Sequence, residues 1–177
     1  MAADSHVEWA GPSWRLRVRE VTRPDGRREE QGYLEHPGAV VLVPLRAQNE
    51  ILMLRQYRPA LERTILELPA GTRGWEESWL ACAQRELREE TGFRAASFTP
   101  LGKVWPAPGY SDEVLALYLA TGLSRAPLPA DFDEVIALHP LPLEEVVAMA
   151  RDGRLQDGKS IAGILRAAAY LERGGLA

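Results

Sequence analysis

The order of apolar and polar residues predicts mostly strands in the first part of the chain and two helices at its end. Residues 14–21 alternate apolar and charged positions, as a half-buried strand does. The turn sequence PDG at residues 24–26 separates them from a second strand over residues 30–35. We therefore expect an N-terminal β-hairpin, preceded by a loose lead-in over residues 1–13.

The remaining pattern predicts a buried sheet with helices packed on it. A continuous apolar run over residues 38–45 is typical of a strand that is buried on both faces. Further strands are expected over residues 51–57, 65–69, 98–104, 114–120 and 135–141. A helix is expected over residues 142–150, ended by Gly153, and a last helix starts at Asp157 or Ser160 with a core stripe of Ile164, Leu165, Ala168 and Leu171. This segregated order of strands and helices indicates an α+β fold with a mixed sheet between helices.

Acidic residues are concentrated on one predicted helix, over residues 78–91. Glu86, Glu89 and Glu90 stand at i, i+3 and i+4, so they share one face of that helix. Three like charges so close repel each other, and such clusters are what hard divalent cations require. The alternative is a solvated acidic face that Arg85 and Arg88 stabilise.

The residues around these glutamates form a longer pattern. It resembles the Nudix box, G-x5-E-x7-R-E-U-x-E-E-x-G-U with U aliphatic or aromatic, and every fixed position is matched: Gly71, Glu77, Arg85, Glu86, Leu87, Glu89, Glu90, Gly92 and Phe93. The resemblance to Nudix hydrolases implies an α/β/α sandwich. On this basis residues 37–177 are expected to be the Nudix domain, and residues 1–36 a lead-in and hairpin associated with a dimer partner.

The same resemblance implies roles for the residues of the box. A Mg²⁺ ion, with Mn²⁺ or Zn²⁺ as alternatives, would be held by the backbone carbonyl of Ala70 and the side chains of Glu86, Glu89 and Glu90. Structural roles are implied for Gly71, Glu77, Arg85 and Gly92. Gly92 is also expected from its place in the pattern to end the helix in a left-handed conformation.

Composition and charge argue against several other classes of function. The 177 residues carry a net charge of −4 and no basic stripe, which argues against nucleic-acid binding. No apolar run approaches the roughly 20 residues of a membrane span, and the N-terminal residues do not resemble a signal peptide. The single cysteine, Cys82, fits a reducing cytoplasm and is expected to be a packing residue.

Motifs outside the box indicate the substrate. The sequence RQYR at residues 55–58, LELPAG at 66–71, PAPGYSDE at 106–113 and LQDGKS at 155–160 resemble the ADP-ribose pyrophosphatase branch. The resemblance implies substrate contacts by Arg55, Arg58, Glu67, Pro108, Ser111, Asp112 and Glu113. For the two arginines, the alternative is surface charge paired with Glu62 or Glu67.

The general base is expected in a loop before the last strand. Relatives place a glutamate there, and this chain offers Asp131 and Glu134, with Glu89 as the fallback base. A solvated acidic loop without a catalytic role is the alternative. Loop closure of this kind would also exclude water from the site.

The favoured function is Mg²⁺-dependent hydrolysis of ADP-ribose to AMP and ribose 5-phosphate by a homodimer. Trp9, Trp14, Tyr33 and Trp105 are candidates to stack on the adenine. Alternatives are a Nudix hydrolase of another nucleoside diphosphate derivative (FAD, NADH, a nucleotide sugar or a dinucleoside polyphosphate), a non-catalytic module that binds ADP-ribose, or a purely structural acidic helix.

Overall fold

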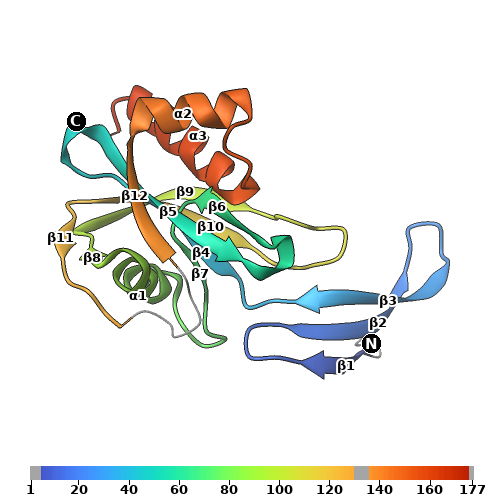
Figure 1. Ribbon diagram of the computed structural model, residues 1–177. Helices are drawn as coiled ribbons and strands as arrows, with labels where there is room; N and C mark the ends of the chain where they lie inside the picture. Colours follow the sequence, from blue (N-terminus) through green and yellow to red (C-terminus); the bar gives the residue numbers. More distant parts are fainter. Residues whose placement is uncertain (1–4, 130–135, 176–177) are drawn as a thin grey trace.

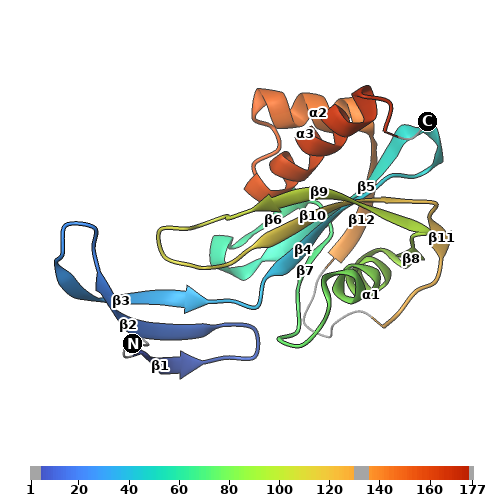
Figure 2. The same ribbon diagram turned by 180° about the vertical axis from the view of Figure 1, so that it is seen from behind.

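The molecule consists of a layered body and a small N-terminal sheet that projects from it (Figures 1 and 2). The structure, a computed structural model, describes residues 5–129 and 136–175. In the body, α1 lies on one side of the central strands, and α2 and α3 lie on the other. This arrangement confirms the predicted α+β sandwich.

The N-terminal sheet has three antiparallel strands in the order β1 (Ser5–Ala10), β2 (Arg15–Thr22) and β3 (Arg28–Glu35). The β2–β3 hairpin was predicted, but the lead-in prediction for residues 1–13 was wrong where β1 forms. Every residue of β1 is exposed. Its only alternation of apolar and charged residues is the short run Val7-Glu8-Trp9, which is less than the roughly four to eight residues that identify a half-buried strand.

The central sheet has the order β7-β4-β10-β9. Strand β4 (Ala39–Pro44) is buried throughout, as its apolar run predicted. It pairs in parallel with β10 (Leu115–Thr121) and antiparallel with β7 (Ala70–Thr72), and β10 pairs antiparallel with β9 (Ser97–Val104). The short strand β7 was not predicted, because the preceding apolar residues 65–69 gave the stronger strand signal.

Both faces of the central sheet are covered by helices. On one face, Cys82 and Leu87 of α1 (Trp79–Thr91) pack with Val40 and Leu42. On the other face, α3 (Gly158–Glu172) packs against β4, and Ile164 lies in that core. Of the predicted stripe on α3, Ile164 and Ala168 are buried and Leu165 and Leu171 are partly buried.

A second sheet of three antiparallel strands extends the body, in the order β12-β5-β6. Its strands are β5 (Glu50–Arg58), β6 (Arg63–Glu67) and β12 (Ile136–Pro142). Helix α2 (Leu143–Asp152) follows β12 and packs on α3. Two short 3-10 helices flank β5 (Ala47–Asn49 and Pro59–Leu61), and β8 (Phe93–Arg94) pairs with β11 (Ser124–Arg125).

The ends of the helices follow their sequence signals. Ser78 caps α1 by accepting a hydrogen bond from the Ala81 N–H, and Gly92 ends it with φ of 75°. Asp157 caps α3 in the same way, and Gly153 ends α2 with φ of 85°. Among the described residues, no helix is both long and apolar enough to cross a membrane.

Candidate active site

Arg85 is the centre of the box. Its Nε and Nη2 donate to the two carboxylate oxygens of Glu77, at 3.0 Å each. Its Nη1 donates to Glu86 at 2.6 Å and to Glu89 at 2.8 Å, and Nη2 also reaches the Thr72 carbonyl at 3.2 Å. These bonds raise the pKa of Arg85, and those to Glu77 contribute most. The same bonds between Arg85 and Glu77 lower the pKa of Glu77. One guanidinium thus joins the box loop, strand β7 and helix α1.

The backbone of β7 lies directly against two glutamates of α1. The Ala70 N–H donates to Glu90 Oε2 at 2.8 Å. A Cβ added at Gly71 would lie 1.8 Å from the carboxyl carbon of Glu86, so only glycine leaves room for that carboxylate. Glu86 and Glu90 are 8% and 7% exposed. Buried carboxylates of this kind require cations or hydrogen-bond donors close by.

The three glutamates of the predicted metal site therefore share one face of α1, as their spacing indicated. In the described part of the chain, no three acidic, histidine or cysteine side chains are gathered so that they could hold a metal ion together. Arg85 draws Glu86 and Glu89 to itself instead. The oxygens of Glu86, Glu89 and Glu90 are nevertheless the kind of ligand that hard divalent cations prefer. The glycine at position 71 leaves space for the carboxylate of Glu86.

A cavity of about 400 Å³ opens beside the box. Its walls include Ala70 and Gly71 of the box strand together with Arg58, Glu67, Glu113, Asp157 and Lys159. Three residues that the motifs outside the box singled out, Arg58, Glu67 and Glu113, therefore line the same cavity as strand β7. The cavity therefore places these motif residues beside Ala70, one of the metal-binding candidates.

Glu67 is a buried residue of the cavity wall and is bound by two cations. Its side chain is 1% exposed, and it accepts from Arg58 Nε at 2.9 Å and Arg58 Nη2 at 2.8 Å. Lys159 forms a further ion pair with it. Burial lowers the pKa of Arg58, but the hydrogen bonds and charge of Glu67 outweigh this and raise it overall. The pairing with Glu67 was one of the alternatives that the sequence left open for Arg58.

Arg55 does not join Arg58. Successive side chains of a strand point to opposite faces, so residues three apart on β5 lie on different faces. Arg55 is exposed, and the described lining of the cavity does not include it. Because the RQYR motif was treated as one unit in the sequence analysis, the face of Arg55 was not separated from that of Arg58.

The predicted substrate-binding residues of the loop before β10 lie at two different cavities. Glu113 lines the cavity beside the box. Pro108, Ser111 and Asp112 line a separate cavity of about 330 Å³ together with Tyr33 and Trp105. Ser111 Oγ donates to the Leu34 carbonyl at 3.1 Å, and Asp112 Oδ1 accepts from the His36 N–H at 2.8 Å. These two side chains tie the loop to β3 and the linker that follows it.

The candidates for the loop base, Asp131 and Glu134, lie outside the described residues. The chain shortly before them is attached to the end of α1. Arg88 Nε donates to the Ala126 carbonyl at 2.8 Å, and the Ala126 N–H donates to the Gly92 carbonyl at 2.9 Å. The assignment of the base stays a prediction.

Asp157 and Lys159 line the cavity but had no assigned role in the sequence analysis. Both belong to the LQDGKS motif at the start of α3. The Leu68 N–H donates to the buried Ser160 Oγ at 2.7 Å, which brings the start of α3 to the end of β6. The motif itself was the available signal, but the contact spans 92 positions and could not be read from the sequence.

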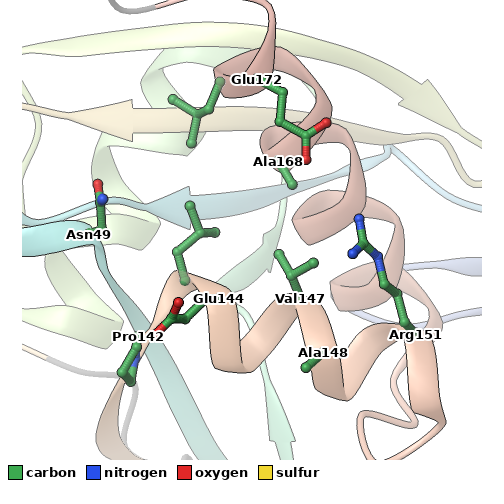
Figure 3. A pocket seen from close by; sticks show the side chains of 10 residues that line it. Asn49, Pro142, Glu144, Val147, Ala148, Arg151, Ala168 and Glu172 are labelled. Atoms are coloured by element: carbon green, nitrogen blue, oxygen red, sulfur yellow. The ribbon is translucent and has the colours of Figure 1, made fainter.

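A larger cavity, of about 540 Å³, lies between α2 and α3. Figure 3 shows Val147, Arg151 and Ala168 among its walls. Its lining contains no residue of the box and no residue of the other motifs. We therefore do not place the active site there.

The sandwich, the braced glutamate helix and the adjoining cavity define a Nudix-type hydrolase fold. The sequence model of the NUDIX domain matches residues 35–163, and the chain belongs to this family. It is a Nudix hydrolase. Enzymes of this family generally use divalent metal ions and act on small nucleotide substrates.

Several known proteins are similar to this chain. The methanol dehydrogenase activator of Bacillus methanolicus is 35% identical over 158 residues, covering 88% of this chain and 85% of the relative. The ADP-ribose pyrophosphatase of Bacillus subtilis is 33% identical over 147 residues, covering 82% and 80%. The crystal structure of an ADP compounds hydrolase superposes with a TM-score of 0.82, covering 98% of this chain and 95% of the other, at 22% identity. This last similarity shows the fold.

Proposed function

We propose that the protein hydrolyses ADP-ribose to AMP and ribose 5-phosphate in a Mg²⁺-dependent reaction. The observation that carries this proposal is the shared cavity, in which Arg58, Glu67 and Glu113 lie beside Ala70 and Gly71 of the box. These motif residues carry the resemblance to ADP-ribose pyrophosphatases, and one relative at 33% identity has that name. The proposal also includes a cytoplasmic location, which the single cysteine supports.

The metal ion would be held by Glu86, Glu89, Glu90 and the carbonyl of Ala70. When bound, it would neutralise the charge of the diphosphate and lower the pKa of a bound water. Arg85 compensates part of the charge of Glu86 and Glu89, which reduces the repulsion between these two carboxylates on α1. Glu77 holds the guanidinium on its other side and keeps it at the box.

The reaction consumes one water. Its oxygen forms a new bond to one phosphorus, the P–O bond of the anhydride breaks, and two phosphate monoesters leave. A base must accept the proton of the water, and we propose Asp131 or Glu134 for this role, with Glu89 as the fallback. If Asp131→Ala and Glu134→Ala both retain full kcat, the loop base is excluded and Glu89 becomes the candidate.

We also propose that the N-terminal region, residues 1–36, joins two copies of the chain, while residues 37–177 form the hydrolase domain. The support is a group of large apolar side chains left exposed on β1, β2 and the turn between them. Val7 is 41% exposed, Trp9 48%, Trp14 38% and Leu16 37%. Burying such side chains against a second copy is favourable by about 25 cal/mol per Å² of apolar surface. Light scattering should give twice the monomer mass, and Leu16→Glu should shift it toward the monomer.

The test of the substrate is turnover with Mg²⁺ on a panel of ADP-ribose, GDP-mannose, NADH, FAD, diadenosine polyphosphates and 8-oxo-dGTP, with EDTA as control. Clear preference for ADP-ribose supports the proposal, and preference for another compound refutes it while keeping the Nudix chemistry. Binding of ADP-ribose without turnover would favour a regulatory module. The similarity to a relative named as an activator makes that the second candidate. A melting temperature that Mg²⁺ does not change would favour a structural acidic helix.

A further inference from the structure

Lys159 is held at a fixed place by two carboxylates. It forms an ion pair with the buried Glu67, and its Nζ lies 2.9 Å from Asp157 Oδ2. Asp157 is fixed in turn, because it caps α3 and accepts from the Ser160 N–H at 3.1 Å. The ammonium therefore has a defined position at the start of a rigid helix.

The ammonium of Lys159 has a donor left for a ligand. A lysine carries three N–H donors, and the two carboxylates use two of them. Within the described residues, no other hydrogen-bond acceptor meets Nζ. The side chain is 16% exposed and lines the cavity beside the box, so the third donor is accessible from that cavity.

Lys159 also stands where this cavity meets a second one. The second cavity has a volume of about 520 Å³ and shares Glu113, Asp157 and Lys159 with the first. It adds Trp105 and Pro106 as an apolar wall, and Trp105 is 70% exposed. A molecule bound at the box can therefore extend past Lys159 and lie along the tryptophan.

The charges around this junction favour hydroxyl groups over phosphate. The cations Arg58 and Lys159 share the walls of the two cavities with the carboxylates of Glu67, Asp157 and Glu113, so anions outnumber cations among these residues. A phosphate placed here would be repelled, because both cations are already paired. Sugar hydroxyls suit the site, since they donate to carboxylates and accept from an ammonium, and the C–H face of a sugar packs on an indole.

We propose that Lys159 contacts the sugar on the side of the diphosphate opposite the nucleoside, and that Glu67 and Asp157 position it for this contact. Trp105 forms the apolar wall for the same sugar. This inference rests on the proposed function and assigns the sugar half of the substrate to the junction of the two cavities.

The experiment compares Lys159→Met with Lys103→Met, which removes the only other lysine of the chain at a position outside both cavities. The probes are the two products, used as inhibitors of ADP-ribose hydrolysis. A hydrogen bond from a charged group corresponds to about a tenfold to hundredfold change in affinity. Lys159→Met should therefore raise the inhibition constant of ribose 5-phosphate by about that factor and change that of AMP less than twofold. KM should rise more than kcat falls, and Lys103→Met should resemble the wild type.

Trp105→Ala gives an independent check, because a side chain that is 70% exposed contributes little to the buried core. This variant should also raise the inhibition constant of ribose 5-phosphate and leave that of AMP unchanged. Unchanged inhibition by ribose 5-phosphate in Lys159→Met, or a larger loss for AMP, overturns the inference while the proposed function stands. If the wild type hydrolyses a different nucleoside diphosphate sugar, the same comparison with that sugar phosphate decides the inference. If it binds no such compound, both proposals fail.

Discussion

Replacing Gly71 by alanine should disable the box without unfolding the protein. Gly71 lies on β7, opposite Val40 of β4, and its backbone is not in the left-handed region, so alanine fits the local conformation. The new methyl carbon would lie 1.8, 2.1 and 2.2 Å from the three carboxyl atoms of Glu86. The carboxyl group is the far end of a flexible side chain, and it will move before the strand does.

The size of the effect follows from this geometry. Real Cβ atoms do not approach closer than 3.0 Å, so the carboxyl carbon, now at 1.8 Å, must withdraw by about 1.2 Å. A displacement of about 1 Å at a reacting group can cost about a hundredfold in rate. This corresponds to about 2.7 kcal/mol of activation free energy. Gly71→Ala should thus lower kcat about a hundredfold, an effect of the same kind as Glu86→Gln.

Stability should change little, because alanine restricts the unfolded chain and offsets part of the strain in the folded one. The melting temperature is expected within about 4 °C of the wild type. The assay is Mg²⁺-dependent turnover of ADP-ribose, with Mn²⁺ titration as a measure of metal affinity. Gly32→Ala is the control, since its Cβ would meet only Leu16 at 3.9 Å. Turnover of Gly71→Ala within threefold of the wild type would refute the reasoning, as would loss of the fold.

Three further predictions concern side chains around the site. Arg58→Ala should raise KM about tenfold or more, because Arg58 lines the cavity, whereas Arg55→Ala should leave KM unchanged; steady-state kinetics of both variants decides this. Arg85 lowers the pKa of Glu77 below 4.5, so this pair stabilises the fold above that pH and loses its effect as the pH falls through the lowered value. Acid unfolding, followed by circular dichroism, should therefore begin at higher pH in Arg85→Gln; coinciding curves would contradict it. Burial raises the pKa of Cys82 to about 12, so iodoacetamide at pH 8 should leave the native protein unmodified, with mass spectrometry as readout and urea-unfolded protein as control.

Local patterns were sufficient for most of the fold. The buried strand β4 and the ends of α1 were predicted closely because burial and capping leave direct marks in the sequence. Strand β1 was missed because it is exposed on both faces and is held by backbone pairing with β2. The alternation in its sequence is limited to Val7-Glu8-Trp9, which is too short to predict a strand.

The positions of the candidate site residues could be predicted where one element carries them, and less well where several elements meet. The shared face of Glu86, Glu89 and Glu90 follows from helix geometry alone. Lys159 enters the cavity only because α3 packs against the end of β6, which no local pattern contains. The two-residue period of a strand would have predicted that Arg55 and Arg58 point to opposite faces, but their motif was treated as one unit in the sequence analysis.

The parallel pairing of β4 with β10 also constrains how the chain reaches this structure. Ala39 lies opposite Leu115, and the whole Nudix box is contained in the stretch between them. Such a distant contact must overcome the entropy of closing a long loop before it contributes any stability, so it slows folding. During synthesis, β4 cannot pair with β10 until residues 115–121 have left the ribosome. Until then the apolar face of α1 has only part of its final packing surface, and the newly made chain is most exposed to aggregation at this stage.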